Sequence, residues 1–214
     1  ALLIGGSDVS AFVGVNGGSA SAIGLQLASA DFGLALLTSR ADSARTWTSF
    51  QAHADSLSFV GISGITAQAT GINVAINQAG KDGDSVVDYR AGKTSLAVPI
   101  SASTSLTLSL DGSEGEVIKA SGALDIDLFG FFTVKGDFAV EQRSQDVTLS
   151  DGSLIKAADL ITIGGHNVDA FAGVRAGSAD QVGVSLGGVN FGLALVTDPA
   201  DEARSFTSLQ ATAA

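Results

Sequence analysis

An internal repeat limits the architecture of this chain more than any other feature. Residues 160–214 align with residues 1–55 at a shift of 159 without a gap, and 28 of the 55 aligned positions are identical. A fixed period of this kind is typical of arrays in which each unit packs against the next one. We therefore divide the chain into one complete tandem repeat, residues 1–159, and the first third of the next repeat, residues 160–214. The ending within a period, and the absence of methionine, predict a piece of a longer array.

Composition excludes several classes of protein. The hydrophobic fraction is 45% and the mean hydropathy is +0.36, which is too apolar for a disordered chain. Eleven basic residues against 22 acidic residues give a net charge of −11, so no nucleic-acid partner is expected. The lack of cysteine excludes disulfides and metal–thiolate sites. Every apolar run is interrupted well before the ~20 residues of a membrane helix, so the chain is predicted not to be transmembrane.

The pattern of residues predicts an all-β fold. Leucine and isoleucine alternate with aspartate over residues 124–128, and a similar alternation resumes after Phe129-Gly130, which predicts a hairpin with one apolar face. Asp-Gly pairs mark turns elsewhere in the chain. We expect an antiparallel meander of many strands per 159-residue repeat, coiled or layered into an elongated, solenoid-like or superhelical array.

Residues 41–57 have two interpretations. Trp47, Phe50 and Leu57 keep a spacing that suits a helix. Thr48 and Ser49 disfavour a helix, and both return in the second copy. We favour a strand for this segment.

The expected core is the aliphatic and aromatic face of these strands. Phenylalanine and branched aliphatic residues recur there at alternate positions, as a face that is buried by packing requires. The predicted structural core consists of Phe32, Leu34, Leu36, Phe50, Leu124, Ile126, Phe132, Val134 and Phe138.

Two groups of acidic residues offer oxygen ligands to calcium, which binds six to eight carboxylate, carbonyl or water oxygens. Neither group completes an EF-hand pattern. The alternative interpretation is that they are solvated turns, and no cofactor is required by the rest of the sequence. The candidate calcium ligands are Asp82, Asp84, Asp88, Asp111, Glu114 and Glu116.

No catalytic centre is predicted. His53 and His166 are the only histidines, and each aligns with a different residue type in the other copy. Serine and threonine are frequent but lack a positioned base. The charged residues Asp42 and Arg45 return as Asp201 and Arg204, either as a ligand contact or, as we favour, as an ion pair or a turn anchor. The chain is therefore not expected to be an enzyme.

Two segments of the sequence resemble repeat units of giant tandem-repeat bacterial cell-surface proteins. They are residues 32–38, Phe-Gly-Leu-Ala-Leu-Leu-Thr, and residues 57–66. The resemblance covers the whole chain and lies in its period and composition. It implies an adhesin-like or filament-like role outside the cell or on its surface, often assisted by calcium, and it transfers no functional residues.

Three functions follow from these observations. The first is a structural repeat unit of an extracellular fibre, filament or adhesin stalk, whose partners are neighbouring copies joined by β-sheet stacking. The second is an apolar β-groove that binds or conducts lipid, lined by residues 124–140. The third, a carbohydrate-binding or carbohydrate-active module, is disfavoured because one tryptophan and one tyrosine supply few sugar-stacking rings.

Overall fold

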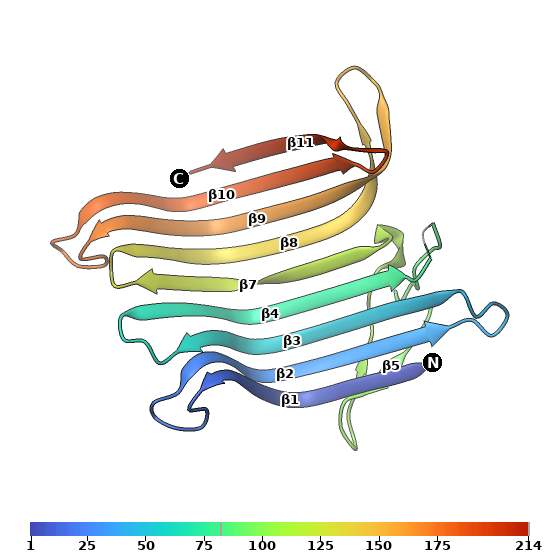
Figure 1. Ribbon diagram of the computed structural model, residues 1–214, viewed down its shortest axis with the longest axis horizontal. Helices are drawn as coiled ribbons and strands as arrows, with labels where there is room; N and C mark the ends of the chain where they lie inside the picture. The colour runs from blue at the N-terminus through green and yellow to red at the C-terminus, as the bar shows by residue number, and fades with distance from the viewer. Residues whose placement is uncertain (82, 214) are drawn as a thin grey trace.

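The computed structural model describes residues 1–81 and 83–213, and these form β-strands, turns and loops without an α-helix (Figure 1). A short 3-10 helix covers Gly112–Glu114. The strands are β1 Leu2–Val15, β2 Ile23–Thr38, β3 Thr46–Val60, β4 Ile65–Ala79, β5 Ala97–Pro99, β6 Ser105–Thr107, β7 Val117–Leu128, β8 Phe132–Thr148, β9 Leu154–Val174, β10 Val182–Asp198 and β11 Asp201–Thr212.

Nine of the strands form one antiparallel sheet in the order β1-β2-β3-β4-β7-β8-β9-β10-β11. Neighbours in the sheet follow one another along the chain, except that the connection from β4 to β7 contains the small β5–β6 hairpin. The predicted all-β antiparallel meander is confirmed. Within residues 41–57, the part from Thr46 onward lies in β3, and residues 41–45 form the turn before it rather than a helix. Strands β1 and β11 are the two outer edges of this open sheet (Figure 1).

The predicted hairpin forms between β7 and β8. Ile126 lies opposite Val134, so the aliphatic residues of both strands share one face. Phe129 and Gly130 both have positive φ, and the Gly130 N–H donates to Asp127 Oδ1 at 2.7 Å. Glycine tolerates this conformation without steric cost, which makes the turn compatible with the sequence.

The repeat in the sequence is also a repeat in the pairing of strands. Strands β9, β10 and β11 correspond to β1, β2 and β3. Ile4 pairs with Leu34 in the first copy, and the equivalent Ile163 pairs with Leu193 in the second. The pairing of β8 with β9 connects the complete repeat to the next one within a single sheet.

Irregular positions in the middle of the strands are retained in both copies. Asp8 and Ser29 have positive φ; the Asp8 N–H donates to Asp31 Oδ1 at 2.8 Å, and the Ser29 N–H donates to Ser10 Oγ at 3.5 Å. The second copy has the same two contacts, from Asn167 N–H to Asn190 Oδ1 at 3.0 Å and from Gly188 N–H to Asp169 Oδ1 at 2.9 Å. Bulges of this kind bend a strand, so they give the sheet a curvature that repeats with the period.

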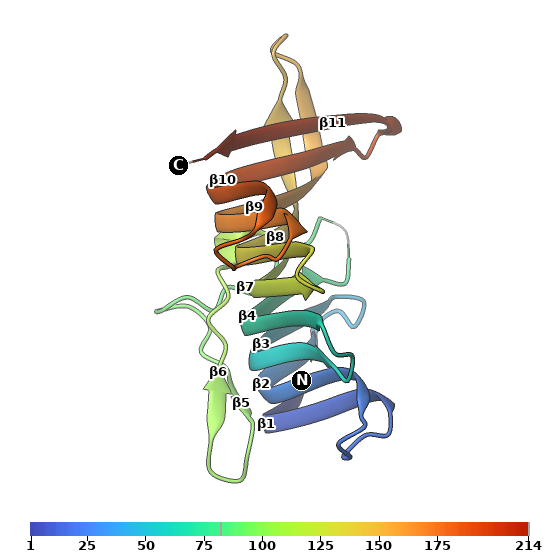
Figure 2. The same cartoon turned by 90° about the vertical axis from the view of Figure 1, so that its left-hand side faces the viewer.

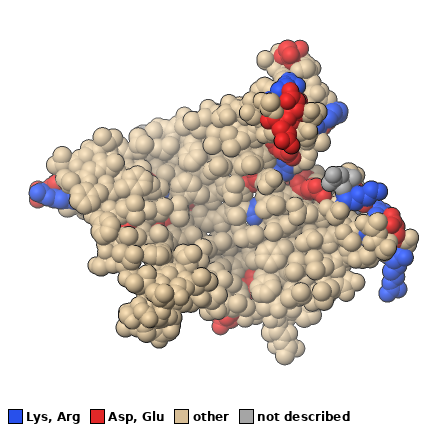
Figure 3. All heavy atoms as spheres, viewed as in Figure 1, with Lys and Arg blue, Asp and Glu red and all other residues tan. Residues whose placement is uncertain are grey.

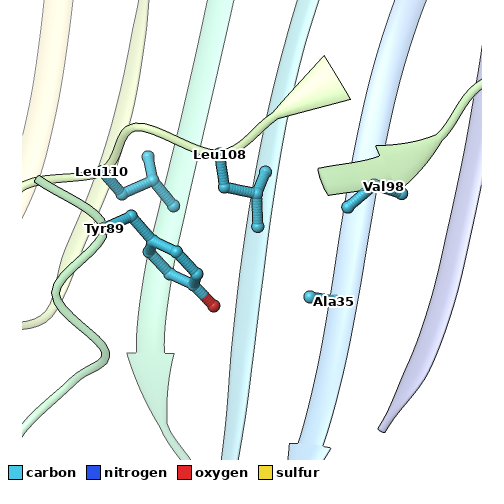
Figure 4. Packing of buried hydrophobic residues seen from close by; sticks show 5 residues of the cluster. All are labelled: Ala35, Tyr89, Val98, Leu108 and Leu110. Carbon is cyan, nitrogen blue, oxygen red and sulfur yellow. The ribbon is translucent and has the colours of Figure 1, made fainter. Parts of the chain in front are cut away.

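One face of the sheet is covered by residues 80–81 and 83–116, which we call the insertion. It runs behind β1 to β4 in Figure 1 and lies on the left of the sheet in Figure 2. Leu108 and Val98 of the insertion pack on Ala35 of β2, and all three are buried. Tyr89 and Leu110 complete this cluster (Figure 4). The main core therefore lies between the insertion and the sheet.

A second buried cluster lies near the other end of the sheet. It contains Ile155 and Ala158 from the β8–β9 hairpin, together with Leu160 and Val196. Ala194, which corresponds to Ala35, packs against this cluster. The hairpin therefore covers the same face of the sheet in the second copy that the insertion covers in the first.

Candidate functional site

The face of the sheet opposite the insertion, which we call the open face, carries no acidic or basic side chain in its central rows. Residues directly opposite one another in neighbouring strands share a face, so these rows follow from the register. One row consists of Gly6, Phe32, Ala52, Val74, Ala120, Val140, Ile163, Leu193 and Leu209. A second row consists of Val13, Leu25, Phe59, Ala67, Ile126, Val134, Ala170 and Leu186.

The open face is accessible to solvent and is hollowed. Leu57 and Val140 expose 38% and 42% of their surface, although both are large and apolar. The strands bend away from the insertion at their ends, which makes the open face concave (Figure 2). Over its centre lies a hollow of about 280 Å³. Figure 3 views this face and shows charged side chains mainly near its margins.

A buried network of hydrogen bonds attaches the insertion to the other face. The Tyr89 hydroxyl donates to Ser49 Oγ at 2.9 Å, and Ser49 Oγ donates to Asn77 Oδ1 at 3.1 Å. Asn77 Nδ2 donates to the Val87 carbonyl at 2.8 Å. Burial raises the pKa of Tyr89. Each side chain of this network has a partner within it, so the network positions the insertion without leaving any of these groups unpaired.

Two further contacts hold the insertion near the ends of the network. The Ser109 N–H donates to Gln51 Oε1 at 3.1 Å, and Trp47 Nε1 donates to the Ser85 carbonyl at 2.9 Å. In the second copy, Ser208 and Gln210 stand where Ser49 and Gln51 stand in the first, and both are exposed. The polar face of β11 therefore keeps two of the side chains that bind an insertion.

The acidic candidates inside the insertion bind basic side chains and backbone N–H groups. Arg90 Nη2 is 2.7 Å from Asp88 Oδ2, and Arg90 Nε is 3.2 Å from Asp111 Oδ1. The Gly112 N–H also donates to Asp88. The hydrogen bonds from Arg90 hold the pKa of Asp88 well below its usual range. Bonds from Ser113 lower the pKa of Asp111.

The other acidic candidates are separated from one another. Asp84 pairs with Arg45, Glu114 pairs with Lys119, and Glu116 accepts the Ala79 N–H at 2.9 Å. Asp82 lies outside the described residues. Within residues 1–81 and 83–213, no three histidine or acidic side chains come together as a group that could hold a metal ion.

Acid is expected to weaken the attachment of the insertion. Because the pKa of Asp88 is lowered in the folded protein, its contribution to stability is complete above the unfolded value of about 3.9 and is lost as the pH falls through the lower folded value. We expect the urea midpoint of unfolding to decrease as the pH is lowered from about 5 to about 2.

The matched variant for this test is Asp88→Asn, which keeps a hydrogen-bond acceptor but has no titrating group. It should be less stable at neutral pH, and its urea midpoint should vary less with pH below about 4 than that of the wild-type protein. Equal pH dependence of the two proteins would contradict the role of Asp88.

The residues predicted as the structural core lie on the open face, and none of them is buried. Leu36 and Phe132 are exposed, while the other seven are half-buried by their neighbours in the sheet. Phe32 and Phe50 touch, with ring centroids 6.1 Å apart. The physical reason is that the sheet is a single layer whose cover lies on the opposite face. The alternate positions of Leu106, Leu108 and Leu110 in the sequence are the signal from which this covering segment could have been predicted.

The predicted ion pair between Asp42 and Arg45 does not form, and neither does its counterpart. Asp42 Oδ1 instead accepts the Ala44 N–H at 3.0 Å, as a turn residue does, and Arg45 lies 5.2 Å from the ring centre of Trp47. In the second copy, Asp201 accepts the Ala203 N–H, and Arg204 pairs with Asp198 and lies 5.9 Å from the ring centre of Phe206. In both copies the aspartate accepts an N–H of its own turn, and the arginine lies beside an aromatic ring.

The two histidines have ordinary positions in the sheet. His53 Nδ1 lies 3.1 Å from Asn73 Oδ1, and its Nε2 lies 3.8 Å from Asp55. His166 lies opposite Asp137 in the pairing of β8 with β9. Neither belongs to a group of metal-ligating residues within the described part of the chain.

Comparison with protein-family models, with curated proteins and with solved structures found no match. Among the residues that the structure describes, no helix has the length and apolar character needed to cross a membrane. A function is therefore inferred from the repeated strand register, the two sheet edges and the open face.

Proposed function

We propose that this chain is a structural repeat unit of a long extracellular fibre, filament or adhesin stalk, in which successive copies extend one β-sheet. The observation that carries the proposal is the pairing of β8 with β9, which joins one repeat to the next. Its partners are neighbouring copies of the same unit. The location outside the cell is supported by the resemblance to bacterial surface repeat proteins.

The strand pairing at the junction between the copies indicates how a further copy would attach to the sheet. At this junction Val140 pairs with Ile163, and Phe138 pairs with Gly165. The ring of Phe138 also meets Phe191 edge to face, with centroids 6.2 Å apart. Strand β1, the equivalent of β9, has Ile4, Gly6 and, on its neighbour, Phe32 at the corresponding places. A preceding copy of β8 would therefore find the same side chains along the outer edge of β1.

The other edge supports the same arrangement. Strand β11 is the equivalent of β3, which pairs with β4 in the complete repeat. Ser208 and Gln210 are exposed on β11, and their equivalents Ser49 and Gln51 bind the network of the insertion. A following copy would supply both the pairing strand and the insertion. Edges completed by the next copy avoid the uncontrolled pairing that an open edge invites.

The length of the array follows from the number of strands in each period. One period contributes six strands to the sheet, β1 to β4 with β7 and β8. Adjacent strands lie about 4.8 Å apart, so each added period should lengthen the sheet by about 29 Å. The twist between strands would turn this sheet into a superhelix.

The proposal is tested by comparing the present chain with longer chains that carry one and two additional copies of residues 1–159. Small-angle scattering and electron microscopy should show a rod whose length rises by about 29 Å with each copy. Separate globules joined by flexible segments, or a maximum dimension that does not rise with copy number, would refute the continuous sheet.

A further inference from the structure

We propose that the open face of the sheet binds the acyl chains of lipids. The face is concave, and its central rows contain no acidic or basic side chain from β1 to β11. Alkyl chains have no polar groups to satisfy, so a surface without charges or unpaired donors suits them. The inference goes beyond the structural role proposed above and does not depend on it.

The apolar rows extend across the whole sheet. The nine strands extend over roughly 38 Å across the sheet, and ten residues of a strand extend over roughly 33 Å. Large apolar side chains such as Leu57 and Val140 are exposed on this face. Exposed apolar side chains that are contiguous mark sites of interaction.

The face is continuous through the junction between copies. Val140 of β8 and Ile163 of β9 lie side by side in the row that begins at Gly6 and ends at Leu209. The bulges near Ser29 and Gly188 occupy equivalent positions, so the curvature continues as well. An acyl chain bound at the centre of the sheet meets the same apolar surface on both sides of the junction.

The hollow favours an acyl chain over a second copy of this protein. It is lined by apolar and small residues from β3, β4, β7, β8 and β9, among them Leu57, Ile72 and Phe138. Two identical concave faces would meet at their rims and leave the two hollows empty between them, which forfeits packing contacts. A flexible alkyl chain can follow the hollow and fill it.

The chain covers two parts of the opposite face with its own segments and leaves a hollow of about 680 Å³ over β7 to β11 on that face. The insertion packs on Ala35, and the β8–β9 hairpin packs around Leu160, both on that face. Among the described residues, no segment crosses the open face, where Leu57 and Val140 remain exposed. The described segments therefore leave the open face uncovered.

The test measures binding of cis-parinaric acid, a fatty acid whose fluorescence rises in an apolar environment, to the 214-residue chain. We expect a saturable rise, and native mass spectrometry should detect the bound fatty acid. The double substitution Leu57→Asp with Val140→Asp should weaken binding by about tenfold or more, because it places carboxylates beside the hollow.

The matched control is Ser58→Asp with Ser208→Asp. These residues adjoin Leu57 and Leu209 in the sequence but lie on the opposite face, and neither lines the hollow of the open face. The control therefore carries the same added charge and should bind as the wild-type chain does. Circular dichroism checks that both double variants keep the sheet, which is expected because Leu57 and Val140 are exposed.

Three results would overturn the proposal. The first is the absence of saturable binding by the wild-type chain. The second is equal binding by the two double variants. The third is a dimer, seen by sedimentation without fatty acid, that the open-face variant dissociates while fatty-acid binding stays unchanged; a second copy would then be the occupant. None of these results bears on the extension of the sheet, which scattering from longer chains tests separately.

Discussion

Replacing Leu108 with alanine is expected to lower the free energy of unfolding by about 2–5 kcal/mol. Leu108 is only 1% exposed and packs between the insertion and the sheet, in the cluster that contains Val98 and Ala35. Alanine would remove its contacts and leave a cavity where the insertion meets β2. Urea unfolding, followed by the fluorescence of Trp47 and by circular dichroism, measures the change.

The control is the same substitution on the open face, Leu57→Ala. Because Leu57 is 38% exposed and has no covering layer, its loss should cost about 1 kcal/mol or less. The contrast matters because both positions are leucines in apolar surroundings, one in the insertion that packs on the sheet and one on the open face of the sheet. If the two variants are destabilised equally in the absence of lipid, the open face is covered in solution and the single-layer description is wrong.

Replacing Gly173 with alanine is expected to cost about 1–3 kcal/mol. An added Cβ would lie 2.5 Å from Gly183 Cα in the neighbouring strand and 2.8 Å from the Phe171 ring, and it would also meet the Val182 carbonyl oxygen. Two of these obstacles are backbone atoms of β10, so the strands would have to separate. Thermal and urea unfolding both report this loss of stability.

Gly192 supplies the matched control in the neighbouring strand. Its φ is not positive, and an added Cβ would have no heavy atom within 4 Å. Gly192→Ala should therefore leave the stability unchanged or raise it by up to about 1 kcal/mol, because alanine restricts the unfolded chain. Equal destabilisation by the two substitutions would show that glycine is needed in these strands for a reason other than close packing.

The same close packing explains why glycine and phenylalanine are retained together in the repeat. The Phe12 ring lies over Gly14 and Gly24 in the first copy, as the Phe171 ring lies over the equivalent glycines in the second. A ring placed over a glycine replaces the side-chain contacts that glycine lacks. The signal was present in the sequence as paired identities, but the sequence did not show which ring covers which glycine.

The class of fold and its repeat were readable from local pattern. Alternation over residues 124–128 predicted the β7–β8 hairpin and the face that its aliphatic residues share, and the alignment of the two copies anticipated their common register. These features depend on neighbours along the chain or on adjacent strands, where side chains alternate with a period of two.

The choice of buried face was not readable in this way. Alternation groups Phe32, Leu34 and Leu36 on one face of β2 but does not say whether anything covers that face. The cover came from the insertion, whose Tyr89 and Leu108 pack against the opposite face and bury Ala35 instead. Spacing along a strand determines which side chains lie together, whereas burial depends on where a segment distant in the sequence docks. That docking rests on hydrogen bonds such as Tyr89 to Ser49, which no periodic pattern encodes.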